Sequence, residues 1–217
     1  MKCLDSVTLL GIDGGGNRPL ITKAMQYSKR ELTFGRSLLL SPHCDYADTD
    51  DIDIVNINAM DYNEWNRFTI QEIHKYIDTP HYLYVDTDGF VIHPELWTDE
   101  FLNYDYAGAP FYYQGHIQSG PCVDATVKAK PESTINLVGN GGFTLRSKKL
   151  AEAMVDCPDI RYVPEDVYIT LNNYDYFVSK GITYCPLDLA YTFAQNRLQD
   201  SGNSFGFHGD KNHIHNV

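Results

Sequence analysis

Strand-like and helix-like segments alternate along the first 90 residues, and this alternation restricts the folds that the chain can adopt. Apolar runs typical of strands occupy residues 7–12, 38–40, 52–57 and 82–85. Helical periodicity covers the intervening residues 19–30 and 63–77. A chain of 217 residues is long enough for one domain with a large core. The alternation therefore predicts an α/β fold, a single domain with a mostly parallel central sheet flanked by helices.

Two carboxylates follow directly after the last of these strands. Asp86 and Asp88 stand where the apolar run 82–85 stops and the chain turns. Open α/β sheets bind ligands in the crevice at the carboxyl ends of their strands. Carboxylate oxygens suit Mg²⁺ or Mn²⁺, which proteins usually hold with one or two carboxylates plus substrate phosphates. The pair indicates a metal–diphosphate site, and a solvated acidic turn is the alternative interpretation.

The net charge of the chain restricts its partners. It has 17 Lys and Arg against 29 Asp and Glu, a formal charge of −12 at pH 7. This charge argues against nucleic-acid phosphate or an anionic membrane as the partner. A nucleoside diphosphate would be repelled as well, unless a divalent cation screened both sides. We therefore expect Mn²⁺ or Mg²⁺ as a cofactor.

Cysteine usage and hydropathy bear on the compartment. The five cysteines are odd in number and lack metal-type spacing: Cys3, Cys44, Cys122, Cys157 and Cys185. Reduced thiols in a cytosol-like compartment fit this pattern. The residues near Met1 do not resemble a signal peptide, and no apolar run has the length of a bilayer span. We expect a cytoplasmic protein with no membrane span in this chain.

Two further motifs carry candidate site residues. Three glycines between residues 139 and 142 permit positive φ and close approach of the backbone to a ligand, although a β-bulge or tight turn would also explain them. Pro164, at an expected helix start, puts Glu165 and Asp166 in the first turn. Carboxylates there are favoured by the helix dipole, and one of them could serve as a general base.

The loop at 110–132 and the C-terminal histidines complete the pattern. Helix and strand periodicity fades at 110–132, which is typical of an active-site lid or of a plain surface loop. His208, between aromatic residues and a glycine, is a candidate metal ligand. His213 and His215 follow among polar residues, where we expect a solvated terminus rather than a metal-binding tail.

Taken in order, four of these motifs resemble the signature of GT-A-fold glycosyltransferases. That signature has an Asp-x-Asp motif, a glycine loop, an x-Glu-Asp motif and a C-terminal histidine. The chain is also similar to a group of small GT-A-like domains with TDGF, YDYIGAP-like, GNGGFSLRS, PEDV and FGFHG segments. The matching stretches are 87–90, 104–110, 139–147, 164–167 and 205–209, and the upstream stretch 62–66 also fits. The resemblance covers nearly the whole chain and implies a GT-A-type, Rossmann-like domain.

For the donor, the resemblance implies a metal site and a nucleoside site. Asp88 matches the metal ligand of the Asp-x-Asp motif, with Asp86 contacting metal or ribose, and His208 completes the metal shell. The turn from Gly11 through Asp13 to Asn17 receives the nucleoside, with Asp13 facing the base. Uridine diphosphate is the favoured leaving group on family grounds.

For the acceptor, the resemblance implies an inverting reaction. Asp166 matches the catalytic base, and Glu165 orients the acceptor. Gly141 and Gly142 lie against the donor sugar or the acceptor. Residues 1–105 would then form a nucleotide-binding half and residues 106–217 an acceptor half.

The expected function is transfer of a sugar from a nucleotide-sugar donor to a hydroxyl of a glycan, a lipid-linked sugar or a small molecule. A nucleotidyltransferase that makes a nucleotide-sugar is one alternative, because Gly14-Gly-Gly-Asn-Arg18 resembles a phosphate loop without the lysine. The other alternative is a non-catalytic carbohydrate-binding domain on the same fold.

Overall fold

The computed structural model describes ten stretches of the chain: residues 1–16, 18–43, 51–113, 116–117, 124–128, 136–159, 161–162, 164–196, 202–209 and 213–215. Asn17, Cys44, Cys122 and most of the expected loop at 110–132 lie outside them. Predictions that concern those residues stay predictions.

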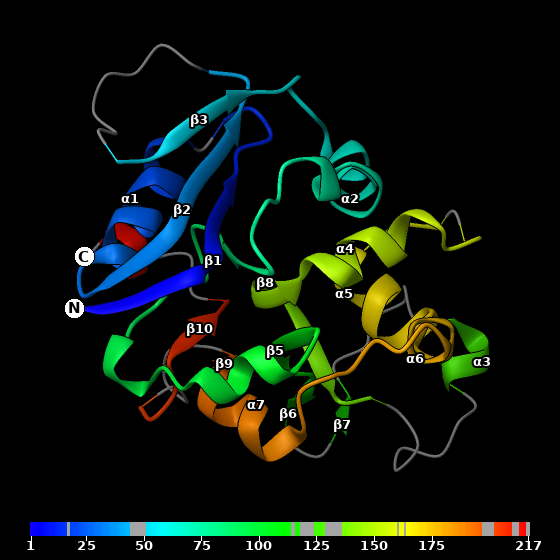
Figure 1. The fold of residues 1–217 in the computed structure, drawn as a ribbon. Coiled ribbons are helices and arrows are strands. Elements are labelled where there is room, and N and C mark those ends of the chain that lie inside the picture. The colour runs from blue at the N-terminus through cyan, green and yellow to red at the C-terminus, as the bar shows by residue number, and fades with distance from the viewer. Residues whose placement is uncertain are drawn as a thin grey trace.

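A six-stranded sheet forms the centre of the molecule (Figure 1). Its order is β3 (Asp53–Asn56), β2 (Leu32–Ser41), β1 (Lys2–Ile12), β4 (His81–Val85), β8 (Val138–Ser147) and β5 (Tyr106–Pro110). The first four strands are parallel, and β8 is antiparallel to both of its neighbours. The predicted α/β fold with a mostly parallel central sheet flanked by helices is confirmed.

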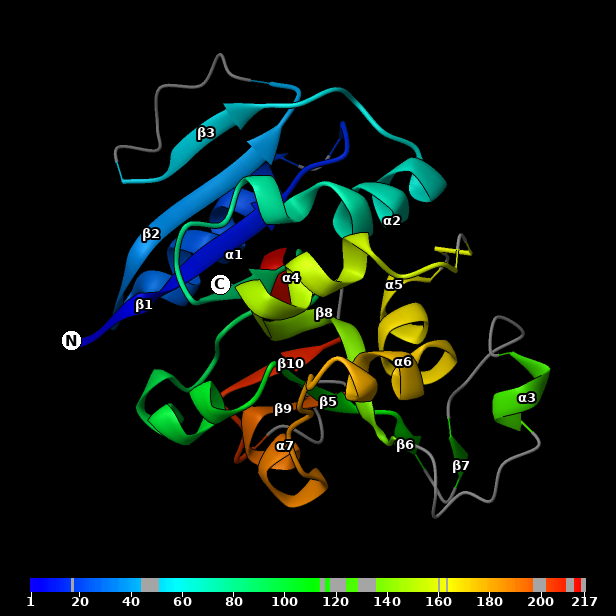
Figure 2. The same ribbon diagram turned by 45° about the vertical axis from the view of Figure 1, so that its right-hand side comes forward.

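Alternation of side chains along the strands divides the core into two layers. In β1, Leu9 belongs to one buried cluster, whereas Leu10 belongs to the other. Leu83 and Tyr84 of β4 divide in the same way, as the period-2 geometry of a strand requires. Helices α1 (Arg18–Lys29) and α7 (Leu187–Phe193) pack on the first face. Helices α2 (Tyr62–Gln71), α4 (Lys148–Val155) and α6 (Tyr174–Ser179) pack on the second (Figure 2).

Helix α2 is shorter than the single helix that periodicity predicts at 63–77. It begins at a capping box, in which Asp61 and Glu64 each accept a hydrogen bond from the other's backbone N–H. The helix ends at Gln71, and a 3₁₀ turn (Ile73–Lys75) continues the apolar face. The apolar spacing was therefore correct, but it did not reveal this change of helix type.

The other elements are short. Hairpin strands β6 (Tyr112–Tyr113) and β7 (His116–Ile117) precede α3 (Ala125–Lys128). Helix α5 (Glu165–Val167) runs into a π-helical segment (Tyr168–Asn172). The 3₁₀ turns are Pro94–Leu96, Asp99–Asn103 and His213–His215. Strands β9 (Ala194–Asn196) and β10 (Gly206–His208) form a parallel pair.

The C-terminal segment packs against the segment that follows β4. The carbonyl of Phe205 accepts hydrogen bonds from the backbone N–H groups of Ile92 and His93. Ile214 is fully buried in the core, whereas His215 is exposed, so the expectation of a solvated terminus holds at His215 and fails at Ile214. The apolar side chain of Ile214 anchors the turn between the two histidines.

Two further observations concern the predictions about compartment. Cys3, Cys157 and Cys185 are free thiols. Among the described residues, no helix combines the length and the apolar character that crossing a membrane requires.

Candidate functional site

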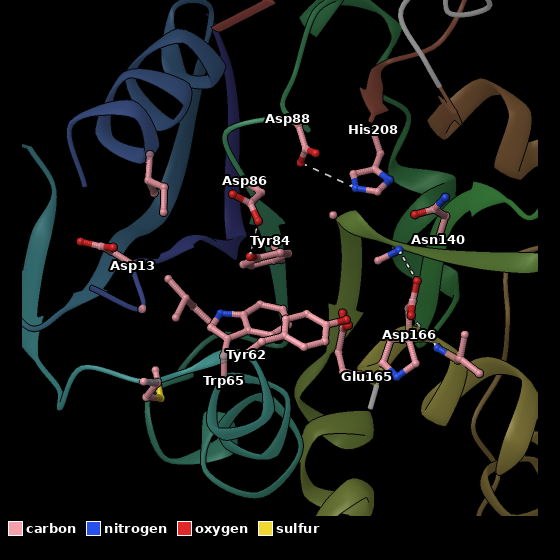
Figure 3. Close-up of a pocket in the computed structure, with 18 of the residues that line it drawn as sticks. Asp13, Tyr62, Trp65, Tyr84, Asp86, Asp88, Asn140, Glu165, Asp166 and His208 are labelled. Atoms are coloured by element: carbon pink, nitrogen blue, oxygen red, sulfur yellow. Dashed lines mark hydrogen bonds and ion pairs between the residues drawn. The ribbon is translucent and has the colours of Figure 1, made fainter. Parts of the chain in front are cut away.

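One cavity of about 720 Å³ opens at the carboxyl ends of β1 and β4 (Figure 3). Its volume is in the range of small-molecule sites, roughly 300–1,000 Å³. The turn after β1, the start of α2, the turn after β4, the start of β8, helix α5 and β10 all contribute to its wall. The described lining residues are Ile12, Asp13, Gly14, Gly15, Gly16, Ile21, Met60, Tyr62, Trp65, Tyr84, Asp86, Asp88, Phe111, Asn140, Gly141, Gly142, Pro164, Glu165, Asp166, Val167 and His208.

The cavity wall is strongly acidic. Five carboxylates line it: Asp13, Asp86, Asp88, Glu165 and Asp166. Of the lining residues that the structure describes, none is a lysine or an arginine. Such a wall repels an anionic ligand unless a cation accompanies the ligand.

Asp86 is held at the end of β4 by the turn that it starts. Its backbone exchanges two hydrogen bonds with that of Gly89. The side chain accepts one hydrogen bond from the N–H of Thr87 (2.6 Å) and one from the hydroxyl of Tyr84 (3.1 Å). Burial, and then the negative charge of Asp88, raise the pKa of Asp86. A cation beside these two carboxylates would relieve their repulsion.

Asp88 faces His208 across the top of the cavity (Figure 3). The Oδ1 atom of Asp88 lies 3.7 Å from Nε2 of His208. The backbone supports this pairing, because the N–H of Gly209 donates to the carbonyl of Asp88 (2.7 Å). Residues 120 positions apart in the sequence therefore meet at one point of the wall.

The three predicted metal ligands do not form a preassembled group. Within the described stretches, no three His, Cys, Asp or Glu side chains are arranged to hold a metal ion together. Asp88 and His208 form a facing pair, whereas Asp86 is bonded to Tyr84 and Thr87. One carboxylate and one imidazole fit the ligand preferences of Mn²⁺ when substrate phosphates supply the remaining ligands.

The predicted glycine loop is a bulge at the start of β8. Ala109 of β5 pairs with Asn140, and Gly108 pairs with Thr144, so the three residues between them on β8 have no partner on β5. Neither Gly141 nor Gly142 has positive φ. Close approach is the reason for glycine here: a side chain at 141 would meet Glu165 and Asp166, and one at 142 would overlap the ring of His208.

Helix α5 presents its two carboxylates differently. Glu165 is buried, and its Oε1 lies 2.7 Å from the guanidinium of Arg146, which is also buried. The half-buried Asp166 accepts hydrogen bonds from the N–H groups of Gly141 (3.1 Å) and Val167 (2.7 Å). Burial, and then the charge of Glu165, raise the pKa of Asp166 to about 7. The ion pair holds Glu165 in place, and Asp166 has the pKa of a general base or acid near neutrality.

The buried ion pair leads to a prediction about stability. Replacing Arg146 by Met should lower the free energy of unfolding by about 3–5 kcal/mol, because the Glu165 charge would be left buried and unpaired. Denaturant titration measures this change. Lys75→Met is the matched control, because its pair with Glu72 is exposed and should contribute at most about 0.5 kcal/mol. Equal effects of the two substitutions would contradict the prediction.

The predicted nucleoside turn has two kinds of residue. Asp13 lines the cavity, and its Oδ1 accepts hydrogen bonds from the N–H groups of Gly15 (2.9 Å) and Gly16 (3.0 Å), which shapes the turn. Gly11 does not line the cavity. A side chain there would meet Ile21 and Met25, so this glycine lets α1 pack closely on β1. Asn17 lies outside the described residues.

Two aromatic residues from the start of α2 were not predicted as site residues. Trp65 contacts Tyr84 with ring centroids 6.0 Å apart, and Tyr62 is 61% exposed beside the cavity. Both belong to the stretch 62–66, which appeared in the sequence analysis as part of a resemblance and, from residue 63 on, as part of the expected helix at 63–77. The capping signal at Asp61 would have placed Tyr62 at a helix start, where a side chain often faces an open site.

Comparisons with known proteins agree with the fold. A family model described as "Protein of unknown function (DUF5672)" matches residues 53–208. A search of curated protein sequences gave no match.

Two solved structures are similar to this chain. One is a glycosyltransferase involved in the glycosylation of the major capsid of PBCV-1, with 14% sequence identity over 97% of this chain and 99% of that chain, at a TM-score of 0.52. The other is the galactosyltransferase LgtC in complex with donor and acceptor sugar analogues, with 12% identity over 96% of this chain and 86% of that chain, at a TM-score of 0.50. Identities this low show the fold alone: the α/β fold of this chain is similar to that of these two glycosyltransferases.

Proposed function

This chain belongs to the DUF5672 family, and we propose that it is a metal-dependent glycosyltransferase. It would move a sugar from a nucleotide-diphosphate donor, with a UDP-sugar favoured, to a hydroxyl acceptor with inversion. The observation that carries the proposal is the acidic cavity on a glycosyltransferase fold, with Asp88 facing His208 at its wall. The acceptor would be a glycan, a lipid-linked sugar or a small molecule.

Charge in the cavity supports the metal dependence. A diphosphate would enter a cavity whose wall has five carboxylates and, among the described lining residues, no lysine or arginine. Asp88 and His208 would hold Mn²⁺ or Mg²⁺, and Asp86 would contact the metal or the ribose. The chemistry that such an ion supplies is Lewis-acid stabilisation of charge on the departing diphosphate, worth several kcal/mol.

The environment of Asp166 supports its role as the base. Its two oxygens accept two backbone hydrogen bonds, which leaves lone pairs for an acceptor hydroxyl. With a pKa of about 7, the carboxylate can take the proton of that hydroxyl near neutral pH. Arg146 holds Glu165 beside it, in a position to orient the acceptor. Gly141 and Gly142 would lie against the donor sugar or the acceptor.

The same proposal assigns donor binding and acceptor binding to different halves of the chain. Asp13, Asp86 and Asp88 come from residues 1–105, the proposed nucleotide-binding half. Asp166 comes from residues 106–217, the proposed acceptor half, and so does His208, which reaches back to the donor side. The two halves share the central sheet, since β4 and β8 are hydrogen-bonded neighbours.

Calorimetric titration of UDP, and then of GDP, with Mn²⁺ and again with chelator, tests the proposal. We expect metal-dependent binding of UDP in the micromolar range, followed by transfer from a UDP-sugar. Binding of neither nucleotide would contradict the proposed donor class. Release of pyrophosphate from a nucleoside triphosphate would favour a nucleotidyltransferase instead, and sugar binding without metal or turnover would favour a carbohydrate-binding domain.

A further inference from the structure

Tyr62 is the most exposed aromatic side chain of the cavity wall. It is 61% exposed, whereas Trp65 and Tyr84 are packed against each other. Figure 3 shows Tyr62 and Trp65, both from α2, on the side of the cavity away from Asp88 and His208. A large apolar ring that stays in contact with solvent beside a polar cavity is a candidate contact surface for a ligand.

A buried amide fixes the backbone that carries this ring relative to the helix start that carries the proposed base. Asn66, which is fully buried, donates from Nδ2 to the carbonyl of Tyr62 (2.6 Å). Its Oδ1 accepts a hydrogen bond from the N–H of Glu165 (2.7 Å). One side chain therefore joins the first residue of α2 to the first residue of α5. Because both helix starts are tied to the same amide, the spacing between the backbone of Tyr62 and the backbone at the start of α5, next to Asp166, is set by the fold.

The chemistry around Tyr62 selects for a neutral, hydroxyl-rich ligand. Glu165 and Asp166 accept hydrogen bonds and carry negative charge, and the described lining residues offer no lysine or arginine for an anionic acceptor. The face of the Tyr62 ring carries partial negative charge and is apolar, which suits a surface of C–H groups. A sugar ring presents C–H groups on one face and hydroxyls at its edge.

We propose that Tyr62 is the stacking platform of an acceptor subsite for a neutral sugar ring, placed by Asn66 so that a sugar hydroxyl reaches Asp166. This inference rests on the proposed function and narrows its acceptor to a carbohydrate. It assigns Tyr62 to acceptor binding and Asn66 to positioning.

Saturation-transfer NMR of the full chain with three probes tests the subsite: methyl β-D-glucoside, methyl β-D-galactoside and methyl α-D-mannoside. Spectra are recorded with and without UDP and Mn²⁺. We expect saturation of the ring C–H protons of at least one probe. Tyr62→Ala should weaken that binding about tenfold, and Tyr62→Phe, which keeps the ring, should leave it within about twofold. Tyr191→Ala, at an exposed tyrosine of α7 outside the cavity, is the matched control.

Three results would overturn the inference. They are no saturation of any probe by the wild-type chain, equal saturation in Tyr62→Ala, and weaker UDP binding in Tyr62→Ala, which would assign the ring to the nucleoside. A failure of the proposed function would give a different set of results from a failure of this inference. If glycosides bind through Tyr62 but no nucleotide binds with Mn²⁺, the subsite stands and the transferase proposal falls.

Discussion

Replacing Asp166 by Asn should lower kcat by about 10²–10⁴-fold, the usual contribution of a general base. The substitution removes the group that takes the acceptor proton and keeps the size of the side chain. An amide can accept only one of the two hydrogen bonds that Gly141 and Val167 donate to the carboxylate, but it also removes the buried charge and its repulsion from Glu165, so no net loss of stability is expected at pH 7 and above. Steady-state kinetics at saturating donor and a thermal unfolding curve measure activity and stability separately.

The pH dependence of the wild-type chain provides a second readout of Asp166. Burial and the Glu165 charge raise its pKa to about 7, and the base must be deprotonated to act. The value of kcat/KM should therefore rise with pH through about 7 and level off above it, with a slope of about tenfold per pH unit on the acidic side. The rise of kcat/KM with pH on the acidic side should disappear in the Asp166→Asn variant.

Two results would contradict the assignment of Asp166. One is an Asp166→Asn variant with activity close to that of the wild type. The other is a product that retains the anomeric configuration of the donor, as determined by NMR, because a base opposite the leaving group requires inversion.

Replacing Asp88 by Asn should weaken the binding of UDP in the presence of Mn²⁺ by about 100-fold or more. The variant should bind UDP with the same affinity in Mn²⁺ as in chelator. Asp88 supplies the carboxylate of the pair with His208, and the diphosphate would then face the remaining acidic wall without a cation. A 100-fold loss corresponds to about 2.7 kcal/mol of binding free energy, which the lost attraction between the cation and the two phosphates can account for. Calorimetry on the unreacted complex measures the change without requiring turnover.

Asp188→Asn is the matched control for this experiment. Asp188 is an exposed carboxylate at the start of α7 and does not line the cavity, so its substitution changes the net charge equally. The Asp188→Asn variant should bind UDP as the wild type does, because exposed charges far from a ligand are screened by salt. If Asp88→Asn bound UDP and Mn²⁺ as the wild type does, Asp88 would not be a metal ligand.

The sequence allowed the fold to be predicted because its signals are local. Strands such as β1 and β4, which are buried on both faces, read as continuous apolar runs, and the helices between strands read with a 3.6-residue period. The same logic places Asp86 at a strand end. The antiparallel course of β8 is set by its pairing with β4 and β5, and pairing between distant strands leaves no periodic trace in the sequence.

Individual residues of the cavity wall could be predicted from motifs, but the way in which they are arranged in space could not. Eight of the ten residues that the motifs singled out line the cavity, including Asp88, Asp166 and His208, and their roles stay predictions. Gly11 belongs to the packing of α1, because a glycine required for helix packing looks the same in a sequence as one required for ligand approach. The two hydrogen bonds of the Asn66 side chain could not be predicted from the sequence, since its partners lie 4 residues before it and 99 residues after it.

The bulge in β8 determines which parts of this cavity can diversify over evolutionary time. Mutations at Gly141 or Gly142 would push against Glu165 or His208, so they would disturb the chemistry together with the shape of the wall. Tyr62, by contrast, is 61% exposed at a well-capped helix start. Lineages that descend from this sequence are therefore expected to acquire new ligand preferences through α2, while the start of β8 stays fixed.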